Sequence, residues 1–261
     1  MLNKVKSRLL SGKKIFAILF ISFAMSIAQE AIPTGDKIVE KMTSIMTQEN
    51  SKGVMTQTIT TSSGKQRTFE FEMFTAGEGE KTLMRYVKPA AARGQAFLML
   101  NNADDIWTYF PRTKRVRKLA SSSKNQKVQG SDFSFEDLGS GDSWDKEYSS
   151  TNLGKEKLDG TDCWKLESIG IPEENPSYQK MVVYVRQTDF YPLKIDYYDD
   201  SDFVEKSLIL EDIKEIERVP TAMIMKMVNH SKGTETIMET LSITYDWQPT
   251  DNFFSERELK K

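Results

Sequence analysis

The chain contains very little of the chemistry on which most catalytic and metal sites depend. Its 261 residues include one cysteine, Cys163, and one histidine, His230. A single cysteine excludes an internal disulfide, and one histidine with one cysteine does not form a typical zinc site. Ser-His-Asp or Cys-His catalysis would need His230, and no nucleophile elbow accompanies it. We therefore interpret His230 as a surface or rim residue and expect no enzymatic activity.

Other signatures of catalysis and ligand chemistry are also missing. No glycine-rich phosphate loop follows a strand. Asp137, Asp142 and Asp145 lack the spacing of a calcium loop, so we interpret them as caps or solvated turn residues. A paired-carboxylate hydrolase leaves no spacing signal, because its residues meet only in the fold, and it has no positive support. We predict no metal site and no cofactor.

The N-terminus has the three regions of a secretory signal. Five basic residues and no acidic residue occur before Glu30. The apolar run at residues 15–25 is shorter than the ~20 residues that cross a bilayer as a helix. Ser26 and Ala28 supply small residues for cleavage before Gln29, and no nearby cysteine provides a lipoprotein anchor. We predict a signal peptide at residues 1–28 and a single domain at 29–261, with an uncleaved anchor as the alternative.

The charge and length of the mature chain argue against a nucleic-acid binder and for a single domain. Removing residues 1–28 leaves 31 basic and 38 acidic residues, and therefore a net charge of −7. Nucleic-acid binders are normally basic, so we expect no nucleic-acid partner. All-β folds commonly form one domain of ~200–250 residues. No second apolar stretch approaches membrane length, so we expect an exported, soluble protein.

Periodicity predicts one helix followed by many strands. Apolar residues recur at three- and four-residue spacing from Asp36 to about Gln48, which indicates an amphipathic helix. From Val54 onward the period is two, and turn signals separate roughly a dozen short strands. A last short helix is expected from about Ser255 to Lys261, with aromatic residues before it packing onto the sheet. The pattern predicts a mainly β (α+β) protein whose large antiparallel sheet curls into a barrel or half-barrel.

Three methionines share one face of a predicted strand. Met223, Met225 and Met227 alternate with Ile224 and other residues of the opposite face. Methionine is unbranched and adaptable, so surfaces that accept variable apolar partners use it often, and an acyl chain is such a partner. Ordinary core filling is the alternative interpretation.

A basic cluster interrupts this otherwise acidic chain. Its members, which lie around the turn at Pro111, are Arg112, Lys114, Arg115, Arg117 and Lys118. Such a cluster suits an anionic headgroup, a membrane surface or an acidic patch on a partner. A solvated sheet edge whose charges discourage aggregation is the alternative.

The segment GSDFSFEDL, residues 130–138, predicts a capped helical turn with an apolar side. Gly130 permits a tight turn, and Ser134 with Asp137 forms a weak capping box. We expect this turn to plug or gate the open side of the curled sheet. Its candidate residues are Ser131, Asp132, Phe133, Phe135, Glu136 and Asp137.

The order of these motifs resembles the outer-membrane lipoprotein-sorting protein family, relatives of the periplasmic lipoprotein carrier LolA and its receptor LolB. The motifs are R-G at 93–94, W-T-Y-F-P at 107–111, K-R-V-R-K at 114–118 and the turn at 130–138. The stretch from Tyr178 to Tyr198 and the residues Asn229, Gly233 and Thr236 are also similar. The resemblance covers most of Gly53 to Trp247, although this chain has no lipobox cysteine.

The resemblance implies an incomplete antiparallel β-barrel, or half-barrel, whose concave side is covered by helices and holds an apolar cavity. It also implies a periplasmic carrier that binds lipid or lipoprotein acyl chains, contacts membranes transiently and often works beside an RND-type transporter. On this basis, the candidate cavity residues are Phe69, Phe71, Met73, Trp107, Tyr109, Met223, Met225 and Met227. The basic cluster would contact headgroups or the transporter. A non-carrier interaction subunit of a transporter or envelope complex is the first alternative, and an envelope lipid hydrolase is the second.

Overall fold

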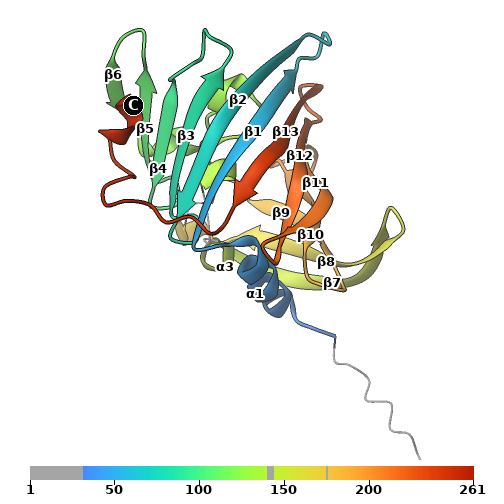
Figure 1. Ribbon diagram of the computed structural model, residues 1–261. Helices are drawn as coiled ribbons and strands as arrows, with labels where there is room; N and C mark the ends of the chain where they lie inside the picture. Colours follow the sequence, from blue (N-terminus) through green and yellow to red (C-terminus); the bar gives the residue numbers. More distant parts are fainter. Residues whose placement is uncertain (1–31, 140–143, 175) are drawn as a thin grey trace, which may run out of the picture. The chain divides into compact units, whose positions relative to one another are not determined.

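Thirteen antiparallel strands form one continuous sheet in the part of the chain that the structure describes (Figure 1). This computed structural model describes residues 32–139, 144–174 and 176–261. The predicted signal peptide, residues 1–28, and Asp142 lie outside the described residues. The sheet and its helices belong to the unit Pro33–Lys261.

In the first half of the sheet, six strands that follow one another in the sequence pair with their neighbours. Its strands are β1 (Asn50–Thr60), β2 (Gln66–Ala76), β3 (Lys81–Lys88), β4 (Ala96–Leu100), β5 (Asp105–Phe110) and β6 (Arg115–Lys118). The second half comprises β7 (Tyr148–Leu158), β8 (Thr161–Gly170), β9 (Lys180–Arg186), β10 (Pro192–Tyr198), β11 (Val204–Ile216), β12 (Val219–Asn229) and β13 (Thr234–Thr244).

Three helices and four short 3₁₀ turns accompany the sheet in the described ranges. The helices are α1 (Gly35–Met46), α2 (Phe135–Gly139) and α3 (Trp144–Glu147). The 3₁₀ turns are η1 (Ser121–Asn125), η2 (Val128–Gly130), η3 (Pro172–Glu174) and η4 (Glu258–Lys260). None of the described helices is long and apolar enough to cross a membrane.

The strand order leaves the sheet open. It runs β6-β5-β4-β3-β2-β1-β13-β12-β11-β10-β9-β8-β7, so β6 and β7 form the two edges. The two halves join where β1 pairs with β13, from Lys52 opposite Thr244 to Thr60 opposite Glu235. The predicted fold, an incomplete antiparallel barrel with helices on its concave side, is confirmed.

Helix α1 forms where the periodicity predicts it and ends two residues earlier. Thr34 caps its N-terminus, because the Thr34 hydroxyl accepts a hydrogen bond from the Lys37 backbone N–H at 3.4 Å. Ile38, Val39 and Met42 are buried on one side, and the spacing of three and four residues explains why they share that side.

The concave face of the sheet is covered by α1 and by the turn before α2. The strands contribute Phe71, Met84, Phe97, Ile106, Leu166, Val183 and Met227 to one apolar cluster. The covering segments add Ile38, Val39, Met42, Phe133 and Phe135 to the same cluster. The concave face is therefore mostly filled by the chain itself.

The C-terminal segment covers part of the opposite face. Trp247, Phe253, Phe254 and Leu259 pack there with Phe74, Leu83 and Leu98. The ring centroids of Phe74 and Phe253 are 4.9 Å apart. The predicted packing of Phe253 and Phe254 onto the sheet is confirmed, but the predicted helix from Ser255 to Lys261 is reduced to η4. A helix this short gains too little to offset its nucleation cost.

The contact between α1 and β7 provides a test of this packing. A Cβ added to Gly35 would lie 2.1 Å from the backbone oxygen of Ser150. Gly35→Ala should therefore lower the free energy of unfolding by about 1–3 kcal/mol, although alanine normally favours a helix. Urea unfolding would measure the effect. Ser44→Ala on the exposed side of α1 is the control and should be neutral, so equal stability of both variants would contradict the packing.

Candidate functional site

A half-open cavity of about 310 Å³ lies between the C-terminal end of α1 and the concave face of the sheet. Four methionines from four different elements, Met46, Met55, Met73 and Met225, line it. Leu210, Pro220, Ala222 and Ile243 add further apolar surface. Because methionine side chains adapt their shape, this wall suits apolar ligands of variable form.

The polar groups of the cavity wall are largely satisfied within the protein. The Tyr191 hydroxyl accepts a hydrogen bond from the Ala222 backbone N–H at 3.0 Å. The hydroxyls of Thr221 and Tyr245 are 2.7 Å apart. Burial raises the pKa of Tyr191 to about 12, so it stays neutral. The wall therefore presents mostly apolar surface to a ligand, with Glu78 as the one charged residue among the described residues that line it.

A second cavity of about 250 Å³ adjoins the first. Met46, Thr75 and Gly79 line both. Helix α2 contributes Glu136, Asp137 and Leu138 to the wall of the second cavity, together with aromatic and apolar residues of the sheet and of the loop before β9. These aromatic and apolar residues include Tyr148, Tyr178, Met181, Ile195 and Tyr197. The predicted plug turn thus borders the space beside α1.

The structure brings together only some of the predicted cavity residues. Met73 and Met225 line the first cavity. Phe69 is partly buried against the filled concave core, whereas Phe71 and Met227 lie fully inside it. Met223 does not line the cavity. The ladder between β11 and β12 has no pair at this position, where Asp212 has a φ of 51°.

Trp107 and Tyr109 lie on the other face of the sheet. Both pack with the C-terminal segment, whereas their neighbour Ile106 belongs to the concave core. Their prediction as cavity residues is therefore corrected, and the reason is the alternation of side chains along β5. Met46 and Met55, which do line the cavity, were not predicted as site residues. Their only sequence signal was their place among the apolar positions of α1 and β1.

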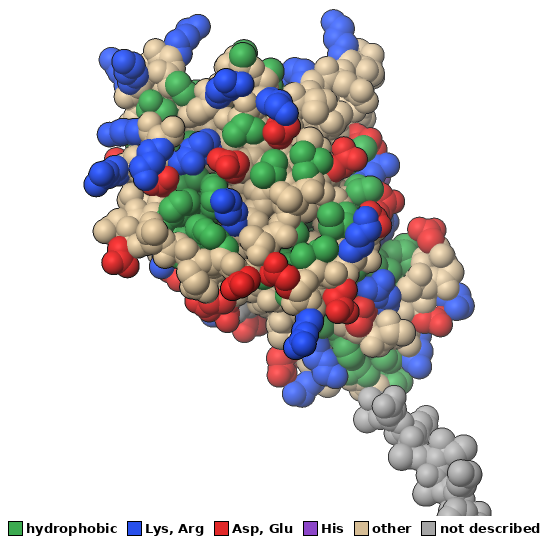
Figure 2. Space-filling view, viewed as in Figure 1, with side chains coloured by type: hydrophobic (Ala, Val, Ile, Leu, Met, Phe, Trp, Pro, Cys, Tyr) green, Lys and Arg blue, Asp and Glu red, His purple; other side chains and the backbone are tan. Residues whose placement is uncertain are grey.

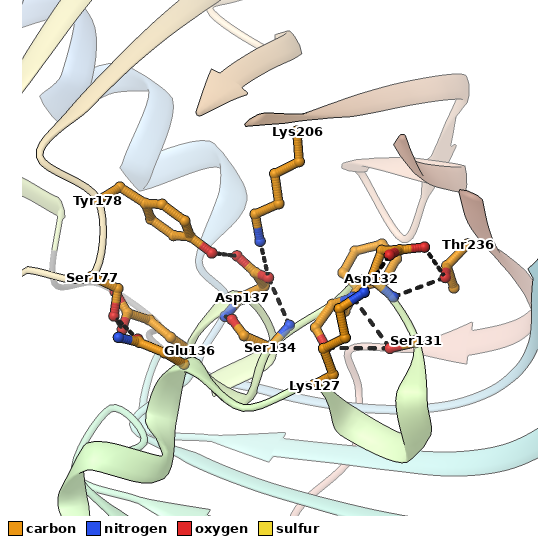
Figure 3. Close-up of polar contacts among 12 residues, drawn as sticks. Lys127, Ser131, Asp132, Ser134, Glu136, Asp137, Ser177, Tyr178, Lys206 and Thr236 are labelled. Carbon is orange, nitrogen blue, oxygen red and sulfur yellow. Dashed lines mark hydrogen bonds and ion pairs between the residues drawn. The ribbon is translucent and has the colours of Figure 1, made fainter. Parts of the chain in front are cut away.

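The turn at residues 130–138 is fixed by a reciprocal cap (Figure 3). The Ser134 backbone N–H donates to Asp137 Oδ2 at 2.7 Å, and the Asp137 N–H donates to Ser134 Oγ at 3.1 Å. The capping box predicted from the sequence is confirmed. It orients Phe133 and Phe135 into the concave core.

A buried ion pair ties this turn to β11. Lys206 Nζ lies 2.6 Å from Asp137 Oδ2, and the two side chains are 7% and 3% exposed. The Tyr178 hydroxyl donates to Asp137 Oδ1 at 2.9 Å. Lys206 also lies over the rings of Tyr178 and Tyr197, 4.7 and 4.8 Å from their centroids. The ammonium of Lys206 and the hydroxyl of Tyr178 are thus both paired with the carboxylate of Asp137, as Figure 3 shows.

Asp132 attaches the same turn to β13. Its carboxylate accepts hydrogen bonds from the hydroxyls of Thr234 at 2.7 Å and Thr236 at 3.0 Å. Lys127 Nζ lies 2.6 Å from Asp132 Oδ1. The Asp132 backbone N–H donates to Thr236 Oγ1 at 2.9 Å. The turn is therefore held to the sheet at two buried carboxylates. Its role as a plug or gate stays a prediction.

Glu136 is the most strongly perturbed carboxyl of this turn. Burial raises its pKa to about 7, against the opposing effect of Lys124, and the carboxylates of Glu147 and Asp137 raise it further. Lys124 Nζ lies 3.7 Å from Glu136. The Ser177 hydroxyl donates to the Glu136 carboxylate. This carboxyl therefore binds its proton more tightly than an unperturbed glutamate does.

His230 does not stand in the arrangement of a catalytic triad. Its Nε2 is 2.8 Å from Ser207 Oγ, and the Ser207 hydroxyl donates to Asp196. The serine thus lies between the acid and the imidazole, whereas a triad needs the imidazole in the middle. Ser207 is also buried. Among the described residues, no group of His, Cys, Asp and Glu could hold a metal ion.

The predicted basic cluster lies on the β5–β6 hairpin at the edge of the sheet. Arg112, Lys114, Arg115, Arg117 and Lys118 are all exposed. Lys118 alone has partners among the described residues, since it pairs with Asp105 and lies over the Trp107 ring at 5.0 Å. The other four cations face solvent.

Removing the charge of Asp137 should expose the cost of burying Lys206. We expect Asp137→Asn to lower the free energy of unfolding by about 3–5 kcal/mol, because it leaves an unpaired ammonium in the core. Urea unfolding measures this change. The control is Asp212→Asn, whose partner Lys214 is 2.8 Å away and 55% exposed; it should cost at most about 1 kcal/mol. A similar loss in both variants would argue against a stabilising role of the buried pair.

Glu136 should make stability depend on pH. Its pKa is raised from 4.5, the value of an unperturbed glutamate, to about 7 in the fold, so the folded chain holds the proton more tightly than the unfolded chain. The stabilisation of the folded state by this tighter proton binding is fully present below pH 4.5 and is lost as pH rises through about 7. Relative to Glu136→Gln, the wild type should lose about 1–3 kcal/mol of unfolding free energy across this window. Urea unfolding at several pH values measures the difference, and parallel profiles for both proteins would exclude this effect.

Comparison with known proteins places the chain in a family. A family model described as an uncharacterized protein matches residues 78–261, and the comparison with curated proteins found no match. A structure from Vibrio parahaemolyticus, described as an outer membrane lipoprotein-sorting protein domain, is 28% identical with a TM-score of 0.78. The match covers 87% of this chain and 98% of that one.

Two further solved structures have the same fold. A DUF1329 family protein from Desulfovibrio piger is 27% identical, with a TM-score of 0.79 and coverage of 86% of this chain and 97% of that one. A LolA superfamily protein from Nitrosomonas europaea is 22% identical, with a TM-score of 0.72 and coverage of 87% of this chain and 100% of that one. The chain therefore belongs to the family of uncharacterized proteins whose model matches residues 78–261, and it has the fold of the outer membrane lipoprotein-sorting protein domain, the DUF1329 family protein and the LolA superfamily protein.

Proposed function

We propose that the protein is a periplasmic carrier that shields acyl chains of a lipid or lipoprotein on their way to the outer membrane. The observation that carries this proposal is the half-open cavity at the end of α1, lined by Met46, Met55, Met73 and Met225. The similarity to a structure described as an outer membrane lipoprotein-sorting protein domain supports it. A cleavable signal peptide at residues 1–28 would deliver the chain to the periplasm.

Size and chemistry of the cavity favour a small apolar ligand or part of a longer chain. Ligand cavities typically span ~300–1,000 Å³ and are mostly apolar with few polar groups, and this cavity of about 310 Å³ lies at the lower limit. Burial of each methylene contributes about 0.8 kcal/mol relative to water. Extraction from a bilayer is nearly balanced, so a membrane donor or acceptor would have to give the transfer its direction.

Space for a longer part of the acyl chain lies beside Met46. This side chain is 44% exposed and lines both cavities. A rotamer change of one unbranched side chain would join the two spaces, and such changes are fast at exposed positions. The turn at residues 130–138 would then border the bound chain through Leu138.

The β5–β6 hairpin would provide the outer contact. Arg112, Lys114, Arg115 and Arg117 have no ion-pair partner among the described residues. They would bind anionic headgroups during a transient membrane contact, or an acidic surface of an RND-type transporter.

A second candidate function rests on how completely the concave face is filled. Phe71, Met84 and Met227 are fully buried, and Phe133 and Phe135 belong to the same cluster. A core of this kind suits an interaction subunit of a transporter or envelope complex that carries no ligand. Ligand binding in the cavity distinguishes the two functions.

Two methionines of one strand give a matched test. Met225 lines the cavity and Met223 does not. Met225→Gln should weaken binding of a fluorescent fatty-acid probe about fivefold or more, because it places an amide against the acyl chain. Met223→Gln should leave the affinity within about twofold. Probe fluorescence titrations on the mature protein, with thermal unfolding as a folding control, measure both.

The carrier proposal fails if the wild type binds no probe or if both variants bind it equally. Absence of probe binding would favour the interaction subunit.

A further inference from the structure

Four hairpins of the sheet turn at the same end of the strands. The end of β1 lies opposite both the start of β2 and the start of β13, since Thr60 pairs with Gln66 and with Glu235. The β1–β2 and β12–β13 turns are therefore neighbours, and a Cβ on Gly233 would lie 3.9 Å from Ser62 Cβ. The β3–β4 and β5–β6 turns continue the row, because a Cβ on Gly94 would lie 3.0 Å from Pro111.

Every one of these turns is basic. Lys65 lies in the β1–β2 turn and Arg67 directly after it in β2. Arg93 lies in the β3–β4 turn and Lys232 in the β12–β13 turn, and all four are exposed. No ion pair joins any of them to another described residue. Residues 60–68, 88–95, 110–118 and 230–234 contain no aspartate or glutamate.

The β5–β6 hairpin completes this surface with Arg112, Lys114 and Arg115. We name these three residues and the four of the preceding paragraph the basic rim. Figure 2 shows Lys and Arg side chains gathered along the upper edge of the sheet, where the hairpins turn. The rim thus extends across the strands of four hairpins of an acidic protein.

The turns at the opposite ends of the same strands are mostly acidic. The β2–β3 turn exposes Glu78 and Glu80, and the β4–β5 turn exposes Asp104. The basic rim ends at the β10–β11 turn, where residues 199–202 include three aspartates. Apart from Lys52 and Lys81, which are also exposed at that end, the charges are therefore segregated along the strand direction of β1–β6.

Protection of a sheet edge does not explain the basic rim. Charges on an edge strand discourage edge-to-edge aggregation, but this reason applies to β6 and not to the central strands β1, β2, β12 and β13. A protein interface is also disfavoured, because specific interfaces have an apolar core. Beside the basic rim, Phe110 is the one large apolar side chain of these four hairpin turns that is exposed among the described residues, at 39%.

We propose that the basic rim docks the protein on the surface of an anionic lipid bilayer. Cations on four separate turns can contact a fluid surface of headgroups without shape complementarity. Each Lys or Arg near such a surface typically strengthens binding about fivefold. The attraction acts over a Debye length, so salt weakens it. The rim lies at the opposite end of the strands from the methionine-lined cavity, and docking does not require the cavity to be filled.

The test uses residues outside the β5–β6 hairpin. The rim variant carries Lys65→Gln, Arg67→Gln, Arg93→Gln and Lys232→Gln. A charge-matched control carries Lys37→Gln, Lys146→Gln, Lys155→Gln and Lys157→Gln, all exposed and on α1, α3 or β7, away from the rim. Co-sedimentation of the mature protein with vesicles of phosphatidylcholine, alone or with phosphatidylglycerol, measures binding at low and at moderate salt.

We expect the wild type and the control to bind only the anionic vesicles, with affinity that falls as salt rises. The rim variant should bind them at least about tenfold more weakly while keeping its affinity for the fatty-acid probe. The proposal would be overturned if the wild type bound neutral vesicles as well as anionic ones. It would also be overturned if the rim variant and the control bound anionic vesicles equally. Binding to polyglutamate without binding to anionic vesicles would also overturn it and would indicate an acidic protein partner. Vesicle binding without probe binding would contradict the carrier function and support the docking surface.

Discussion

The concave face of an open sheet has to be covered by parts of the chain other than strands. Here β6 and β7 do not meet, so neither edge strand closes the barrel over the apolar residues inside. Burial of that surface is the main favourable contribution to folding. Helix α1 and the turn before α2 supply the cover, and they leave space where α1 ends, at the methionine-lined cavity. The cavity therefore exists because the cover is incomplete.

The cover is held by charges as well as by apolar packing. Asp137 and Lys206 form an ion pair at 2.6 Å in which both side chains are almost fully buried. Such pairs are weak contributors to net stability but strongly specify geometry when every partner is satisfied. Tyr178, the Ser134 N–H and the two aromatic rings around Lys206 satisfy this pair. Together with Asp132, it determines where the turn sits on the sheet.

The distribution of charge follows from the same antiparallel topology. Hairpins of an antiparallel sheet alternate between its two ends, so residues far apart in sequence gather at one end. The basic turns at Lys65 and Lys232 lie side by side although most of the chain separates them, and acidic turns lie at the other end of β1–β6. The molecule thus has two separate surfaces of functional interest: an apolar cavity by α1 and a basic rim at the far ends of the strands.

Features that depend on local spacing could be predicted from the amino-acid sequence. Helix α1, the alternation of the strands and the reciprocal cap of Ser134 and Asp137 follow from residues within a few positions of each other. Only the fold decided which face of each strand lies on the concave side. In β5, for example, both faces carry large apolar residues, so the alternation alone does not distinguish them. The fold also decided that Met225 lines the cavity and Met223 does not, and it brought Lys206 to Asp137, 69 positions away. Such contacts depend on the register of distant strands, which local spacing does not encode.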